Sequence, residues 1–79
     1  MAKMSEEMEN ICMDIIQQIV STDKNMNRQG AIEIVKKMRD KAHQTGKKRL
    51  IVIYDRVLHE FEIASDEDYE LLRKQIFGS

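Results

Sequence analysis

Three side chains in this 79-residue sequence have the chemistry expected of a catalytic or metal-binding group: Cys12, His43 and His59. A thiolate is a nucleophile, an imidazole exchanges a proton near neutral pH, and both bind zinc. Zinc ligands usually come in pairs separated by about two to four residues, and these three match no such spacing. We therefore expect no metal site, no cofactor and no catalytic residue, and the protein is predicted not to be an enzyme.

One enzymatic hypothesis remains, and it pairs His59 with Tyr54. Both are polar-tipped side chains on the apolar face of a predicted hairpin described below, where a second chain would complete a pocket. A histidine in this position is more often hydrogen-bonded and half-buried than a general base. Cys12 falls on the apolar face of a predicted helix, where a small packing residue is the more common role.

The length of the chain indicates a single domain, residues 1–79, with a small and marginally stable core. A single cysteine cannot form an internal disulfide, which favours a reducing compartment. The start of the chain is acidic and no long apolar run follows, so neither a signal peptide nor a membrane span is expected. These features predict a cytoplasmic protein without membrane contact.

Two amphipathic helices are predicted in the first half of the chain, over residues 4–20 and 27–44. In both segments apolar residues recur every three or four positions. Three residues are candidate N-caps of the second helix: Thr22, Asp23 and Asn27. Gly46 suits the left-handed position just beyond its end. The apolar face of the first helix is wider than packing on one core requires, so this helix is expected to contact a further partner.

Residues 50–63 are predicted to form a β-hairpin. Leu50 to Tyr54 is an uninterrupted apolar run, and residues 57–63 alternate between apolar and polar side chains as a half-buried strand does. A two-stranded sheet is marginally stable alone and leaves an open edge. A second copy of the chain is therefore expected to cover that edge, with a strand from another protein as the alternative.

A last helix is predicted after the hairpin. Ser65 is its expected N-cap, Asp68 completes a capping-box arrangement, and Gly78 is the expected stop. The order helix, helix, hairpin, helix (ααββα) predicts a small α+β domain. This order lacks the third helix that precedes the hairpin of a winged-helix domain, and the leading strand and GxxG loop of a KH domain.

The surplus of apolar surface favours a small regulatory or adaptor protein that binds other proteins and forms a homodimer. Methionines concentrate in the first helix and adapt readily to irregular partners. The candidate interface residues are Met4, Met8, Ile16, Val20, Ile51, Ile53 and Leu58.

Nucleic-acid binding is the alternative function. Residues 24–56 carry ten basic and three acidic side chains, a net charge of +7, between acidic flanks. Such a segment attracts phosphate, although Glu33 and Asp40 on the outer midline of the second helix favour an ordinary solvated face. The candidate contacts are Lys36, Lys37, Lys41, Lys47, Lys48, Arg49 and Arg56.

Overall fold

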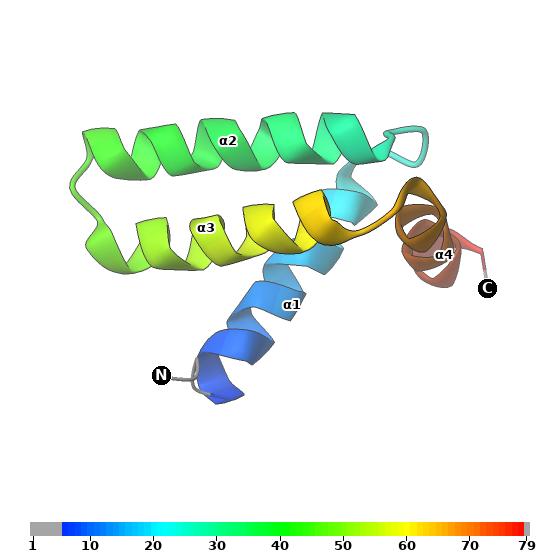
Figure 1. Ribbon diagram of the computed structural model, residues 1–79, viewed down its shortest axis with the longest axis horizontal. Helices are drawn as coiled ribbons and strands as arrows, with labels where there is room; N and C mark the ends of the chain where they lie inside the picture. The colour runs from blue at the N-terminus through cyan, green and yellow to red at the C-terminus, as the bar shows by residue number, and fades with distance from the viewer. Residues whose placement is uncertain (1–5, 79) are drawn as a thin grey trace.

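The computed structural model describes residues 6–78, which form four helices and, within that range, no strand. The helices are α1 (Glu6–Thr22), α2 (Arg28–Gln44), α3 (Lys48–Ile63) and α4 (Asp66–Phe77). Helices α2 and α3 lie side by side and run in opposite directions, joined by a tight turn (Figure 1). Helix α1 crosses α3, and α4 packs at the end of the α2–α3 pair that is remote from the turn (Figure 1).

The predicted α+β fold is wrong, because residues 48–63, which include the expected hairpin, form the single helix α3. Its buried residues are Ile53, Val57, Leu58 and Phe61, whose spacing of one, three and four positions is that of one helix face. The β-branched residues 51–53 favour a strand locally. Burial of one continuous stripe against α1 and α2 outweighs that local preference.

The core draws on all four helices. Its buried side chains are Cys12, Ile16, Ile19, Val20, Ala31, Ile32, Val35, Ala42, Ile53, Val57, Leu58, Phe61 and Tyr69. The rings of Phe61 and Tyr69 lie 6.1 Å apart at a tilt of 56°, within the usual range for a stabilising aromatic pair. This aromatic pair attaches α4 to α3. Every buried side-chain nitrogen or oxygen in residues 6–78 has a hydrogen-bond partner.

The helix ends confirm most of the predicted signals. The Asn27 side chain accepts a hydrogen bond from the Gly30 N–H, and Ser65 Oγ accepts one from the Asp68 N–H. Gly46 has a φ of 68°, the left-handed conformation that glycine adopts without strain. Helix α1 ends at residue 22 rather than 20, and its predicted start at residue 4 lies outside the described residues.

Two side chains of α4 bind the loop between α1 and α2. The Tyr69 hydroxyl donates to the carbonyl oxygen of Met26 at 3.1 Å, and Arg73 Nη1 donates to that of Lys24 at 2.8 Å. These hydrogen bonds join segments more than 40 residues apart in the sequence, with separations of 43 and 49. They fix the position of α4 beside the first inter-helix loop.

Arg28, at the start of α2, fixes the junction between α3 and α4. Its Nη1 donates to the carbonyl oxygen of Phe61 at 3.1 Å, and its Nε lies 2.8 Å from the Asp66 carboxylate. One guanidinium therefore satisfies a carbonyl at the end of α3 and an acidic side chain at the start of α4.

Candidate functional site

The predicted interface residues lie mainly in the interior of a single chain. Four of the seven are buried: Ile16, Val20, Ile53 and Leu58. Met8 and Ile51 are half-buried, and Met4 lies outside the described residues. The open strand edge that motivated the homodimer is absent from residues 6–78, because the hairpin is a helix. Any partner-binding surface therefore has to be sought among other side chains.

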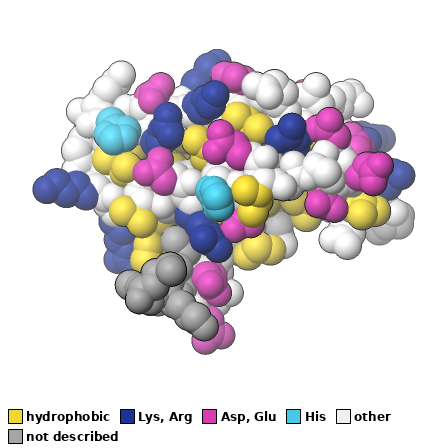
Figure 2. Space-filling view, in the orientation of Figure 1, with side chains coloured by type: hydrophobic (Ala, Val, Ile, Leu, Met, Phe, Trp, Pro, Cys, Tyr) yellow, Lys and Arg dark blue, Asp and Glu magenta, His cyan; other side chains and the backbone are white. Residues whose placement is uncertain are grey.

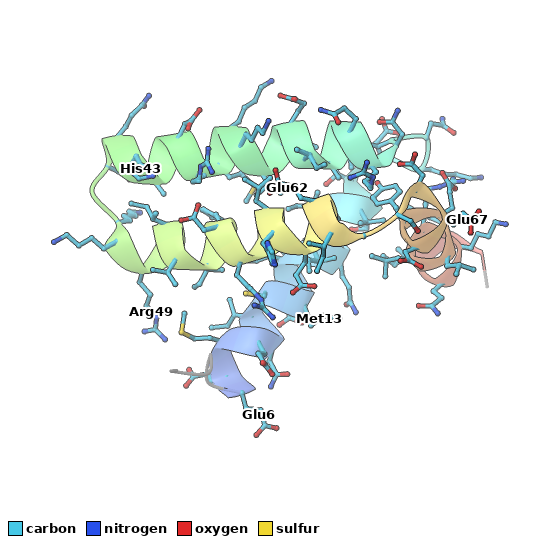
Figure 3. All side chains as sticks on the ribbon, viewed as in Figure 1. Glu6, Met13, His43, Arg49, Glu62 and Glu67 are labelled. Atoms are coloured by element: carbon cyan, nitrogen blue, oxygen red, sulfur yellow. The ribbon has the colours of Figure 1, made fainter. Side chains whose placement is uncertain are left out.

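Four predicted nucleic-acid contacts gather at the turn between α2 and α3. We call this cluster the basic tip: Lys41, Lys47, Lys48 and Arg49, all exposed. Basic side chains protrude at this end of the molecule (Figure 2), where Arg49 and His43 are also seen (Figure 3). No acidic residue occurs from position 41 to 54. None of the ion pairs within residues 6–78 involves a member of the basic tip.

The other predicted contacts are separated from the basic tip. Lys37 is exposed and Lys36 is half-buried, both nearer the middle of α2. Arg56 lies two turns into α3 and pairs with Glu60 at 3.0 Å. The structure thus divides the predicted basic surface into a concentrated tip and scattered or neutralised side chains.

The start of α3 is electrostatically unfavourable. Lys47 is its N-cap residue without a side-chain hydrogen bond, and the first turn contains no acidic residue. Lys48 and Arg49 follow directly, so three cations adjoin the positive end of the helix dipole, where carboxylates are normally preferred. The negative end of α2 across the turn offsets only part of this charge. The tip therefore has a positive potential that attracts anionic groups.

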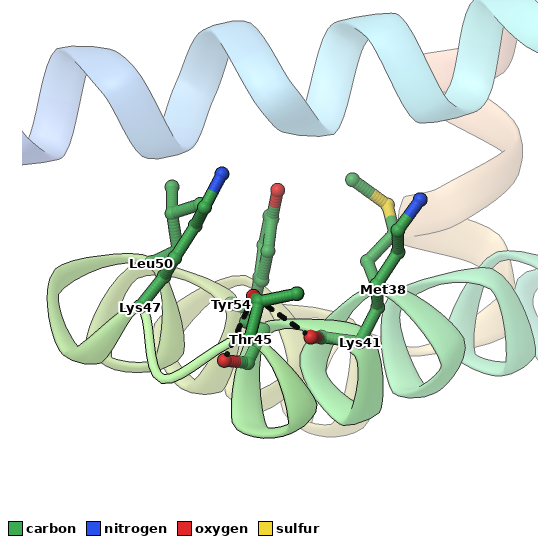
Figure 4. Close-up of a pocket in the computed structure, with 7 residues that line it drawn as sticks. Met38, Lys41, Thr45, Lys47, Leu50 and Tyr54 are labelled. Atoms are coloured by element: carbon green, nitrogen blue, oxygen red, sulfur yellow. Dashed lines mark hydrogen bonds between the residues drawn. The ribbon is translucent and has the colours of Figure 1, made fainter.

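A groove of about 330 Å³ lies beside the basic tip. We call it the lysine-rimmed groove, and it is lined by Met38, Lys41, Ala42, Thr45, Lys47, Leu50 and Tyr54. The side chains of Met38, Leu50 and Tyr54 project from the α2–α3 pair towards the side on which α1 lies (Figure 4). Most of its surface is apolar, and Lys41 and Lys47 supply two ammonium groups at its edge. An apolar hollow with a few charged groups is the usual composition of a binding site.

The turn that follows α2 explains how the rim is built. The Thr45 hydroxyl donates to the carbonyl oxygens of Lys41 and Ala42, at 3.0 and 3.3 Å, and so closes the last turn of α2. Gly46 then reverses the chain in its left-handed conformation. Lys47 is thereby returned to the same groove that Lys41 borders.

Sequence reasoning missed the apolar wall of this groove. The sequence predicts Leu50 and Tyr54 on a strand facing the core, yet they are half-buried on α3 and line the groove. Met38 and Ala42 were correctly placed on the apolar stripe of α2. Met38 and Ala42 are four positions apart, and so are Leu50 and Tyr54. This shared helical spacing is the sequence signal that indicates a common apolar wall formed by two helices.

The three residues with catalytic potential lie apart. Cys12 is buried in α1, whereas His43 and His59 are exposed on α2 and α3. Burial raises the pKa of the Cys12 thiol, which disfavours the reactive thiolate. Within residues 6–78 no three or more His, Cys, Asp and Glu side chains are grouped as metal ligands would be. Tyr54 is half-buried and lines the groove, whereas His59 is exposed and does not line it, so the two do not share this hollow.

Two further findings bear on function. No helix in residues 6–78 has the length and apolar character needed to cross a lipid bilayer. Comparisons with protein-family models, curated proteins and solved structures find no match to this chain. The lysine-rimmed groove and the basic tip are the surface features of the described residues that bear on function.

Proposed function

We propose that the protein is a non-enzymatic cytoplasmic adaptor that captures an acidic amphipathic helix of another protein in the lysine-rimmed groove. The observation that supports this most is the combination of an apolar floor with a cationic edge. Apolar anchors of a helix docking into such a groove are a recurring mode of peptide recognition. Carboxylates beside those anchors would lie near Lys41 and Lys47, and charge complementarity would set the orientation of the helix.

The two components of the groove have different energetic roles. Burial of one leucine-sized anchor contributes about 1.5–3 kcal/mol, whereas an exposed ion pair contributes at most about 1 kcal/mol. Affinity is therefore expected to come mainly from the anchors that reach Leu50 and Tyr54. The lysines accelerate association and select acidic partners, so binding is expected to weaken as the salt concentration rises.

A peptide titration tests this proposal. The probe is a helical peptide with leucines at i, i+4 and i+7 flanked by glutamates, compared with the same peptide carrying lysines instead. The chemical shifts of backbone amides in ¹⁵N-labelled protein should change around Leu50 and Tyr54 with the acidic peptide only. The double variant K41E/K47E is expected to weaken binding by about tenfold.

The matched control changes the same charges elsewhere. Lys24 and Lys37 are exposed and do not line the groove, so K24E/K37E should leave the affinity nearly unchanged. The proposal is wrong if both double variants weaken binding equally, since the effect would then be net charge alone. It is also wrong if the chemical-shift changes lie outside the groove.

The basic tip favours nucleic-acid binding as a second candidate. Lys48 and Arg49 belong to the tip but do not line the groove, so K48E/R49E separates the two functions. If the protein binds nucleic acid, the fluorescence anisotropy of a labelled single strand should rise when the protein is added at low salt. Losing two phosphate contacts should reduce the slope of log affinity against log salt by about 1.4. No binding at low salt would remove this candidate.

A further inference from the structure

We propose that the lysine-rimmed groove also receives α4 of a second copy of this chain, so that the protein associates with itself end to end. This inference rests on the proposed function, because it names one occupant of the same groove. Three features support it: an exposed leucine on α4, the carboxylates around that leucine, and the positions of α4 and the groove in the molecule.

Leu71 has the properties of an apolar anchor. It is 59% exposed, one of the few large apolar side chains of the described residues left open to solvent. It borders a shallow hollow whose other walls are three acidic residues, Asp66, Glu67 and Glu70, and one basic residue, Lys74. Helix α4 therefore presents the same combination that the groove would select in a partner, an apolar side chain among mainly acidic ones.

The charges on the two surfaces are complementary. Two of the three carboxylates near Leu71 already pair within the chain, whereas Glu67 takes part in no ion pair among residues 6–78. The same holds for Lys41 and Lys47 at the groove. A contact between Glu67 and either lysine would therefore form without disrupting an existing pair. Such a contact orients the helix while Leu71 enters the apolar floor.

The shape of the molecule means that an α4 in the groove has to come from a second copy. The groove adjoins the α2–α3 turn, and α4 lies at the opposite end of these helices (Figure 1). His43 and Glu67 lie near the two ends of the molecule (Figure 3). Its longest dimension is 36 Å. Helix α4 therefore cannot reach the groove of its own chain. Because the contact joins two different surfaces, it leaves a groove and an α4 available at the ends of each assembly.

Self-association would regulate access to the groove. At high protein concentration α4 of a neighbouring copy occupies the groove and excludes the acidic helix of a partner. A partner that binds more tightly displaces α4 and separates the copies. The two occupants therefore compete, and each lowers the apparent affinity of the other.

Sedimentation velocity over a range of protein concentrations tests the inference. The mean mass of the wild-type protein should rise between micromolar and millimolar concentration. Both L71K and E67K should weaken association, L71K by about tenfold because it removes the apolar anchor. Glu62 is exposed on α3 and lies outside the acidic hollow, so E62K makes the same charge change without affecting association. Each substitution is on the surface and should preserve the fold.

A charge-reversal mixture gives the decisive result. K41E/K47E and E67K should each remain monomeric alone, because each places like charges at the contact. Mixed in equal amounts they should associate into assemblies in which the two variants alternate. The changed groove of the first variant fits the changed α4 of the second, and the unchanged groove of the second fits the unchanged α4 of the first. A wild-type protein that stays monomeric throughout the concentration range overturns the inference, as does association that L71K leaves intact.

The peptide titration distinguishes this inference from the proposed function. L71K should bind the acidic peptide at least as tightly as the wild-type protein does, because its groove is unchanged and α4 no longer competes for it. If the wild-type protein binds the peptide but remains monomeric, self-association is wrong and the adaptor function stands. If K41E/K47E alters neither peptide binding nor mass, both proposals are wrong.

Discussion

Adjacent residues Val52 and Ile53 give the sharpest test of the fold. Val52 is 52% exposed on α3, and Ile53 is 3% exposed in the core. The predicted hairpin reversed these environments, with Val52 facing the helices. Truncation of a buried isoleucine to alanine costs about 2–5 kcal/mol, since it removes apolar contacts and leaves a cavity. Truncation of Val52 should change the stability by no more than about 0.5 kcal/mol, because the site is exposed and alanine favours helix.

Thermal unfolding followed by circular dichroism measures this difference. In a domain of this size 1 kcal/mol corresponds to a Tm change of about 4–8 °C. I53A should therefore lower the Tm by at least about 8 °C, and V52A should alter it by less than about 4 °C. If I53A does not fold, I53V should still cost about 0.5–1.5 kcal/mol. A Tm that falls more for V52A than for I53A would refute the helical assignment of this segment.

Three further predictions follow from individual side chains. Burial is the main cause that raises the pKa of Tyr69 above its ordinary value of 10.0, and the nearby Glu70 carboxylate is the second. The unfolded state therefore loses this proton first, so the stability contributed by Tyr69 is complete below pH 10.0 and is lost as the pH rises through the folded-state pKa. Y69F should show a smaller alkaline fall in the urea midpoint, and an equal fall in both proteins would contradict this assignment. The buried Cys12 should react with a thiol reagent only when local or global unfolding exposes it. Its labelling rate should therefore rise in parallel with unfolding by urea. Rapid labelling without denaturant would show that the site is exposed. N27A should lower the free energy of unfolding by about 1 kcal/mol because it removes the N-cap of α2, and an unchanged urea midpoint would show that this hydrogen bond contributes nothing.

The helix ends were predictable because their signals are local. Asn27, Gly46 and Ser65 act through hydrogen bonds or backbone conformations confined to a few neighbouring residues. Amphipathic spacing also predicted α1, α2 and α4, since each has one apolar stripe interrupted by charged residues. For these segments local preference and tertiary packing favour the same structure.

The region after residue 48 was mispredicted because its local signals conflict with its packing. The apolar run Leu50 to Tyr54 fits either a buried strand or a helix, and its β-branched residues favour the strand. The deciding pattern is longer: Leu50, Tyr54, Val57 and Phe61 recur at three and four positions across α3. The candidate site was missed for the same reason. The lysine-rimmed groove exists only when α2 and α3 pair as helices, so a hairpin prediction could not reveal it.

The hydrogen bonds from α4 to the first inter-helix loop have a consequence for biosynthesis. The ribosome synthesises α4 last, after the three other helices. The carbonyls of Lys24 and Met26 therefore lack their hydrogen-bond donors, Arg73 and Tyr69, until α4 has been made. The apolar surface beneath Tyr69 also stays uncovered during this interval. The nascent chain should therefore complete its fold in one late step, and a protease that cuts between α3 and α4 should release a fragment prone to aggregate.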